Sequence, residues 1–206
     1  LACIIFTLQS PETSLGFLDR FLACCEAYNI PVLILFNKID LLNFEEVELV
    51  EELQEMYEKL GYQTLQVSSE DKLNLDKLQE IIKDKTSVFF GHSGAGKSTL
   101  VNVLQPDLNL KTNIISETHN KGKHTTTFAQ MHFWHFGGAV IDTPGVREFA
   151  MIDVEKEEIQ HYFPEIFEKG RDCKFHNCKH INEPKCAVLE AIETGEILES
   201  RYITYL

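Results

Sequence analysis

The chain of 206 residues is 44% hydrophobic and carries a formal net charge of −13 at pH 7. It can build a real core, but it is a poor candidate for broad binding to DNA or RNA, because phosphate neutralisation requires clustered lysines and arginines and only local basic patches remain possible. No apolar run reaches membrane-spanning length, and the first eight residues lack the basic flank of a signal peptide, so we expect a cytoplasmic protein with no membrane partner.

The chain opens with two predicted strands that flank a helix. Leu1–Leu8 reads as a buried strand, and apolar positions within residues 15–25 indicate a helix. Pro31–Phe36 is a continuous apolar run, which is typical of a central parallel strand covered on both faces. Because the chain has no initiator methionine and begins directly in a strand, we expect further residues before Leu1.

A short polar motif follows the second strand, where open α/β sheets usually present a ligand loop. Its four consecutive residues are Asn37, Lys38, Ile39 and Asp40. The carboxylate of Asp40 can accept hydrogen bonds from N1–H and the N2 amine of guanine, a pattern that adenine does not offer. Alone, the motif is equally compatible with an Asx turn, so its interpretation as a guanine site depends on the phosphate loop described below.

The next predicted elements are a helix, a strand and a second helix. Asn43–Lys59 is expected to be an amphipathic helix with a capping box at its start and a solvated face of glutamates. Tyr62–Val67 reads as a strand and Leu73–Lys83 as a helix. Between them, Ser68 and Ser69 could back the guanine with short side chains and backbone N–H groups, although a plain strand-to-loop turn explains them equally well.

The most specific motif follows a predicted strand at Thr86–Phe90 and matches the pattern G-x-x-x-x-G-K-[ST]. Its glycines let backbone N–H groups curl around a phosphate, and the following helix directs its positive end toward the anion. Lys97 would reach the β and γ phosphates of a nucleotide, and Ser98 would offer its hydroxyl to Mg²⁺. A glycine-rich turn that only caps a helix is the alternative. The residues of this phosphate loop are Gly91, His92, Ser93, Gly94, Ala95, Gly96, Lys97, Ser98 and Thr99.

A long polar segment at residues 105–123 lacks periodicity and predicts a functional or mobile loop. One of the three threonines that follow, for which we take Thr126, could close over Mg²⁺ and the γ phosphate; a Thr-rich start of a strand is the alternative. A predicted hairpin then leads into Asp142-Thr-Pro-Gly145. Asp142 would hold Mg²⁺ through water, and the N–H of Gly145 would sense the γ phosphate.

Beyond Ala150 the composition turns to acidic helices around a cysteine cluster. Four residues have the spacing C-x₄-C-x-H-x₅-C, namely Cys173, Cys178, His180 and Cys186. Three thiolates and one imidazole make a closed tetrahedral site of the structural zinc type, with His176 as a less favoured substitute ligand. Disulfides are the alternative, but we expect a cytosolic nucleotide-binding protein, and disulfides are rare in the reducing cytosol. We therefore expect a zinc-binding domain at residues 151–206.

The order of the motifs is unusual, because the guanine motif precedes the phosphate loop instead of following it as in a Ras-like GTPase. The chain is therefore circularly permuted, and the segment after Asp142 leads directly into the zinc domain, which would couple that domain to the nucleotide state. The combination of motifs resembles the bacterial RsgA (YjeQ) family of circularly permuted GTPases, which act in late maturation of the small ribosomal subunit. The resemblance rests on the cysteine cluster and on residues 37–40, 91–99, 122–127 and 142–145.

The resemblance implies a circularly permuted Ras-like α/β domain with a mostly parallel sheet at residues 1–150, followed by the small helical zinc domain. It also implies an OB-fold before Leu1, GTP or GDP with Mg²⁺, one structural Zn²⁺, and the small ribosomal subunit and its rRNA as partners of a monomer. Two positions depart from the family's pattern, since Lys123 stands where Arg is usual and Ser69 where Ala is usual.

The expected reaction is hydrolysis of GTP to GDP and phosphate, stimulated by the small ribosomal subunit. Lys97 and the loop amides would stabilise charge on the transferred phosphoryl group, and Asp40 would select guanine. Three residues are expected to hold Mg²⁺: Ser98, Thr126 and Asp142.

The position after Gly145, where Ras has a water-orienting glutamine, is occupied by Val146. An apolar side chain cannot orient water, so intrinsic turnover should be slow, and His124 is the nearest candidate for that role. One alternative function is a nucleotide-latched module that docks RNA or protein with negligible turnover. A P-loop ATPase is less favoured because of residues 37–40.

Overall fold

The computed structural model describes residues 1–108, 110, 130–142, 155 and 157–206. The chain divides into two compact units. The first unit comprises Leu1–Thr13 and Val32–Arg147, and the second comprises Ser14–Pro31 and Glu148–Leu206.

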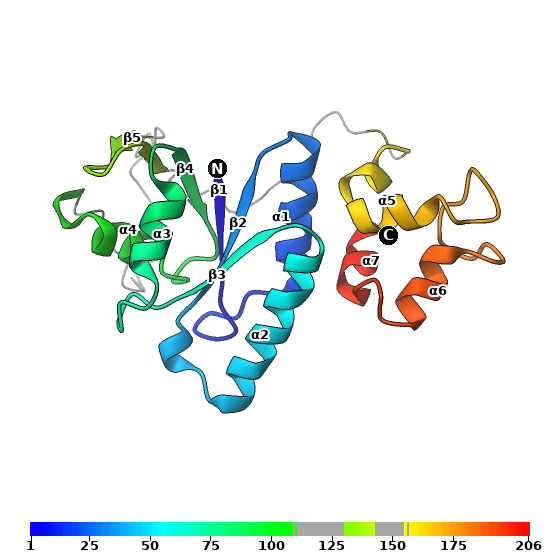
Figure 1. The fold of residues 1–206 in the computed structure, drawn as a ribbon, viewed down its shortest axis with the longest axis horizontal. Coiled ribbons are helices and arrows are strands. Elements are labelled where there is room, and N and C mark those ends of the chain that lie inside the picture. Colours follow the sequence, from blue (N-terminus) through cyan, green and yellow to red (C-terminus); the bar gives the residue numbers. More distant parts are fainter. Residues whose placement is uncertain (109, 111–129, 143–154, 156) are drawn as a thin grey trace, which may run out of the picture. The chain divides into compact units, whose positions relative to one another are not determined.

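A six-stranded sheet lies at the centre of the first unit, in the order β3-β2-β1-β4-β6-β5 (Figure 1). Neighbouring strands from β3 to β6 in this order are parallel, whereas β5 pairs antiparallel with β6 and forms the first arm of the predicted hairpin. Parallel strands end at one edge of a sheet, so the segments that follow β1, β2, β3, β4 and β6 meet there. The strand bounds are β1 Ala2–Phe6, β2 Val32–Asn37, β3 Gln63–Val67, β4 Thr86–Phe90, β5 Gln130–Phe133 and β6 Ala139–Asp142.

The two central strands are buried almost throughout, as their continuous apolar sequences predict. Every residue of β1 is buried, and β2 is buried from Leu33 onward. Cys3 lies in this core, where burial raises the pKa of its thiol to about 12, so it remains protonated and packs as an apolar side chain. Leu78 of α3 and Leu100 of α4 belong to the same core.

The described residues of the first unit form three α-helices: α2 Phe44–Lys59, α3 Leu75–Ile82 and α4 Lys97–Leu104. The capping box predicted for α2 is confirmed: the side chain of Asn43 accepts from the N–H of Glu46 at 3.0 Å, and the side chain of Glu46 accepts from the N–H of Asn43 at 2.8 Å. Short 3₁₀ turns lie at η1 Ile39–Leu41 and η2 Pro106–Leu108. Among the described helices, none combines the length and the apolar character needed to cross a membrane.

The second unit consists of helices that come from both ends of the chain. Its elements are α1 Leu15–Ala27, η3 Ile159–Tyr162, α5 Pro164–Gly170, α6 Ala187–Glu193 and α7 Glu199–Tyr205. Helix α1 packs against η3 and α7, and Ala23 of α1 shares a core with Phe163, Ile166 and Val188. This division differs from the predicted domain limits, which assign Ser14–Pro31 to the first domain; the predicted boundary near Ala150 lies outside the described residues.

A buried arginine joins three helices of the second unit. Arg201 of α7 is 0% exposed, and its Nε and Nη2 donate to the two carboxylate oxygens of Glu165 on α5 at 2.7 and 3.1 Å. Its Nη1 lies 3.8 Å from Oδ1 of Asp19 on α1, and its guanidinium sits 4.6 Å from the ring centroid of Phe163. Bidentate pairing and ring stacking are the arrangements that favour arginine over lysine. This network ties α1 to the C-terminal helices.

Candidate nucleotide site and metal centre

The carboxyl edge of the parallel strands brings together motifs that lie far apart in the sequence. Asn37 is the last residue of β2, Ser68 follows β3, and Gly91 follows β4. The structure thus places the predicted guanine motif, the serine pair and the phosphate loop at one edge of the sheet, which is where open α/β folds hold ligands.

Two glycines shape the phosphate loop. A Cβ on Gly91 would lie 2.9 Å from the carbonyl oxygen of Ile5 on the neighbouring strand, and one on Gly96 would lie 2.4 Å from Nδ2 of Asn37. Both glycines also have positive φ angles, of +147° and +105°, that residues with side chains rarely adopt. The loop can therefore approach both β1 and the guanine motif only because these positions lack a Cβ.

Asn37 connects the guanine motif to the phosphate loop. Its Nδ2 donates to the carbonyl oxygen of Ala95 at 2.8 Å, and the side chain is buried. Its Oδ1 is also buried and has no hydrogen-bond partner among the described residues. Buried polar atoms are nearly always satisfied, so this acceptor is suited to a donor on a ligand or a water.

Two lysine side chains brace the same loop. Lys38 has a left-handed backbone with φ +65°, and its Nζ donates to the carbonyl oxygen of Gly94 at 2.8 Å and to that of Ser10. The Nζ of Lys97 donates to the carbonyl oxygens of Gly91 and His92, both at 2.7 Å. The ammonium of Lys97 is thereby held at the loop whose N–H groups would surround a phosphate.

Asp40 is oriented by a buried serine. The hydroxyl of Ser68 donates to Oδ1 of Asp40 at 2.5 Å and accepts from the N–H of Asp71 at 3.1 Å. From the sequence, Ser68 and Ser69 could either back the guanine or form a plain strand-to-loop turn. In the structure, Ser68 contacts Asp40. The hydroxyl oxygen of Ser69 is buried and has no partner among the described residues.

The structure describes only some of the residues predicted to contact Mg²⁺ and the γ phosphate. Ser98 is the second residue of α4 and is partly exposed, and Asp142 is the last residue of β6, although its side chain is not described. The other residues discussed for this part of the site lie outside the described part of the chain: Lys123, His124, Thr125, Thr126, Thr127, Gly145 and Val146.

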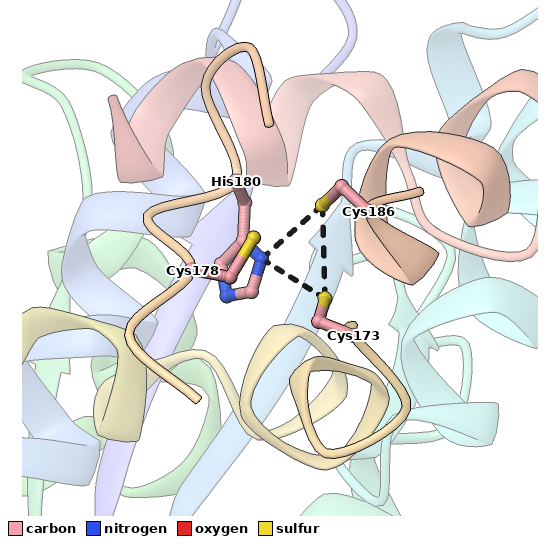
Figure 2. A group of neighbouring side chains, drawn as sticks. All are labelled: Cys173, Cys178, His180 and Cys186. Carbon is pink, nitrogen blue, oxygen red and sulfur yellow. Dashed lines mark hydrogen bonds between the residues drawn. The ribbon is translucent and has the colours of Figure 1, made fainter. Parts of the chain in front are cut away.

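The four predicted metal ligands converge in the second unit (Figure 2). The ligand atoms of Cys173, Cys178, His180 and Cys186 all lie within 4.8 Å of one another. Nδ1 of His180 is 3.6 Å from Sγ of Cys173 and 3.4 Å from Sγ of Cys186, and these two sulfurs are 3.7 Å apart. A tetrahedral ion with metal–sulfur bonds of about 2.3 Å and a metal–nitrogen bond of about 2.0 Å requires separations of about 3.6 to 3.8 Å, so the residues fit a metal ion.

The electrostatics of the cluster also call for a cation. Burial, together with the neighbouring sulfurs, raises the pKa of the Cys178 thiol to about 12. Burial lowers the pKa of His180, which keeps its imidazole neutral and able to coordinate. Deprotonated thiols at this site therefore require a metal ion beside them. His176 is exposed and lies outside the cluster.

The loop that carries the ligands is held from two sides. The carboxylate of Glu183 accepts three backbone N–H groups, and these bonds, led by that of Lys179, lower the pKa of Glu183 to about 2. The hydroxyl of Tyr202 donates to the carbonyl oxygen of His180 at 2.7 Å. The three N–H donors to Glu183 are those of Lys179 at 2.7 Å, Ile181 at 2.8 Å and Asn182 at 3.0 Å.

Comparison with known proteins places both sites in a known family. The model of a family described as RsgA GTPase matches residues 1–152. The chain belongs to the RsgA GTPase family. It is 48% identical over 203 residues to a protein of Christiangramia forsetii, and 49% identical over 205 residues to one of Flavobacterium psychrophilum, both named small ribosomal subunit biogenesis GTPase RsgA. Each alignment covers 98% of this chain but 64% and 62% of those relatives, so the chain spans less than two thirds of their length.

Solved structures agree with this assignment. The crystal structure of YjeQ from Thermotoga maritima has a TM-score of 0.82 and 38% sequence identity, covering 99% of this chain and 68% of that one. The structure of YloQ, described as a circularly permuted GTPase, has a TM-score of 0.76 and 36% identity, covering 99% of this chain and 64% of that one. The resemblance to the RsgA family and the predicted fold class are both confirmed.

Two contacts at this RsgA-type site are made by residues that belong to none of the predicted motifs, Gln9 and Ser10. The Nε2 of Gln9 donates to the carbonyl oxygen of Leu41 at 2.8 Å, and the carbonyl oxygen of Ser10 accepts from Lys38. Both come from the segment after β1, which matches no nucleotide-binding pattern. The only signal that could have marked it is its place after a central parallel strand.

Proposed function

We propose that this chain is the catalytic part of a cytoplasmic, monomeric GTPase that binds GTP with Mg²⁺ and hydrolyses it to GDP and phosphate. The observation that supports it best is the link between the two motifs: Asn37 donates to Ala95, and Lys38 donates to Gly94. A base-selecting loop held directly against a phosphate loop suits one ligand that carries both a base and phosphates. Ser68 orients Asp40, the residue we assign to guanine.

The chemistry assigned to the chain is positioning and charge stabilisation. Lys97 and the N–H groups of the phosphate loop would stabilise negative charge on the transferred phosphoryl group. Mg²⁺, when bound, would neutralise charge on the β and γ phosphates, and Ser98, Thr126 and Asp142 would hold it. The N–H of Gly145 would contact the γ phosphate.

Intrinsic hydrolysis should be slow because Val146 occupies the place of a water-orienting glutamine. His124 is our candidate for that role, since an imidazole can hydrogen-bond an attacking water and exchange a proton with it near neutral pH. Replacing His124 with Ala should abolish stimulated turnover and leave nucleotide binding almost unchanged. Full stimulation in this variant would assign the water to another group.

The metal of the second unit is proposed to be one structural Zn²⁺. Four protein ligands of three sulfurs and one nitrogen, at tetrahedral separations, leave no open position for a substrate and suit zinc better than hard cations such as Mg²⁺. Residues 1–150 and 151–206 remain the proposed functional domains. Helix α1 belongs to the first of these by sequence, and its Ala23 packs in the core that includes two of the metal ligands, Cys178 and Cys186.

The proposed partner is the small ribosomal subunit, including its rRNA. The relatives that share about half of the sequence are named for the biogenesis of that subunit. The test is GTP turnover by the full-length protein with and without purified small subunits. We expect stimulation well above the basal rate, and loss of both rates in Lys97→Ala. Nucleotide-dependent docking on the subunit without any turnover would instead favour the alternative of a docking module.

A further inference from the structure

We propose that residues 7–13, which connect β1 to α1 and are called the 7–13 loop, form a third positioning element of the guanine site. Within it, Gln9 is a positioning residue that acts on Asp40 through the backbone of η1. This inference rests on the proposed selection of guanine by Asp40.

The 7–13 loop is preorganised by two buried threonines, Thr7 and Thr13, which are 0% and 2% exposed. The N–H of Thr13 donates to the carbonyl oxygen of Thr7 at 2.8 Å, and the N–H of Thr7 donates to the hydroxyl of Thr13 at 3.3 Å. The hydroxyl of Thr7 donates to the carbonyl oxygen of Pro11 at 2.5 Å. These bonds close the loop on itself, so its tip is a fixed support and not a free segment.

The tip of the loop contacts residues on both sides of Asp40. On one side, the carbonyl oxygen of Ser10 accepts from Nζ of Lys38. On the other side, Nε2 of Gln9 donates to the carbonyl oxygen of Leu41 at 2.8 Å. The loop also approaches the phosphate loop, because a Cβ on Gly94 would lie 3.5 Å from Cδ of Pro11.

The segment that Gln9 holds has little support of its own. η1 is a single 3₁₀ turn, closed by hydrogen bonds from the N–H of Leu41 to Lys38 at 3.0 Å and from the N–H of Leu42 to Ile39 at 3.1 Å. Such turns have poor hydrogen-bond geometry and few bonds. An external donor on the carbonyl of Leu41 therefore fixes the backbone next to Asp40.

Base selection depends on that backbone position. Ser68 holds only Oδ1 of the Asp40 carboxylate, whereas contact with both N1–H and the N2 amine of guanine requires both oxygens in place. Sites of this kind tolerate displacements of only about 0.5 Å. Ser68 thus holds the carboxylate, and Gln9 holds the main chain that carries it.

The test compares the affinities for GDP and for inosine diphosphate, whose base lacks the N2 amine. We expect Gln9→Ala to weaken GDP binding about fivefold, the effect of one hydrogen bond, and to weaken binding of inosine diphosphate less, so that the ratio of the two affinities falls. Gln9→Arg retains donors and should restore the ratio. Gln63→Ala, an exposed glutamine at the start of β3, is the matched control and should leave the ratio unchanged.

The variant Asp40→Asn separates failure of this inference from failure of the proposed function. If Asp40→Asn changes the ratio and Gln9→Ala does not, the guanine site stands and the positioning role of Gln9 is wrong. If neither variant changes the ratio, Asp40 does not select the base and both proposals fall. A loss of affinity in Gln9→Ala that is equal for both nucleotides, or one that Gln9→Arg does not reverse, would show a structural role only.

Discussion

The hydroxyl of Ser68, which is completely buried, donates a hydrogen bond of 2.5 Å to the carboxylate of Asp40. Ser68 and Asp40 follow different strands, and this bond joins the two loops that we propose to contact the guanine base. Hydrogen bonds to charged groups are stronger than those between neutral groups, so the pair should be sensitive to removal of the hydroxyl.

We therefore predict that Ser68→Ala lowers the affinity for guanine nucleotides about tenfold, because Oδ1 of Asp40 loses its donor. Titration with a fluorescent guanine nucleotide measures this. Gln63→Ala, an exposed residue at the start of β3, the strand that Ser68 follows, is the control, and we expect affinity within about twofold of the native protein. Equal losses in the two variants would contradict the assignment.

Asp40→Asn should move the preference from guanine toward xanthine nucleotides. The new amide presents a donor where the guanine N2 amine also donates, whereas xanthine has a carbonyl oxygen at that position and can accept. Competition between GDP and xanthosine diphosphate measures the change. Unchanged affinity and unchanged selectivity would remove residues 37–40 from the base site.

Elemental analysis should find about one zinc per chain, and Cys186→Ser should lower that content strongly. Since the four ligands are bridged only when a metal ion is bound and metal binding is coupled to folding, metal removal by a strong chelator should also unfold the helices around them. Cys24→Ser, a cysteine of α1 outside the cluster, is the control and should retain its zinc. A metal-free protein with these helices intact would overturn the metal site.

Arg201→Met should destabilise the second unit by about 3 to 5 kcal/mol, because it leaves the buried carboxylates of Asp19 and Glu165 without their cation. Urea unfolding followed by circular dichroism measures the loss. The double variant Arg201→Met with Glu165→Gln lacks one of the two negative charges that face this position, so it should recover part of the lost stability. A loss of less than about 1 kcal/mol in Arg201→Met would mean that the network contributes little.

Glu183→Gln should destabilise the ligand loop by about 1 kcal/mol, the usual effect of losing a carboxylate that accepts backbone N–H groups. The folded pKa of about 2 lies below the ordinary value of 4.5, so the contribution of the carboxylate is complete above about pH 4.5 and is lost as the pH falls toward 2. The difference between native and variant stability should therefore stay constant from pH 8 to pH 5.5. A difference that disappears within this range would show another cause.

The motifs of the candidate site were predictable because each is local. The apolar run of Pro31–Phe36 identifies a buried strand, and the glycines of the phosphate loop stand at the positions whose backbone angles require them. The contact between Ser68 and Asp40 was not predictable, since no spacing rule connects residues on different strand ends. The same holds for Gln9, whose side chain supports a carbonyl that lies 32 positions away.

The membership of α1 in the second unit was beyond sequence reasoning for a similar reason. Helical periodicity shows that one face of residues 15–25 is buried, but it does not show what covers that face. Ala23 packs with Phe163, and Asp19 faces Arg201. A charged residue within a short helix, such as Arg201, would ordinarily be assigned to the surface.

The long separation between Asp19 and Arg201 has a consequence for how the protein is made. The two residues lie about 180 positions apart, so at ordinary synthesis rates α1 leaves the ribosome about 10 to 40 seconds before the arginine that neutralises it. The contact between α1 and Arg201 thus cannot form during translation until α7 has emerged. Products that terminate before α7 would lack the cation that faces Asp19 and become substrates for chaperones and proteases.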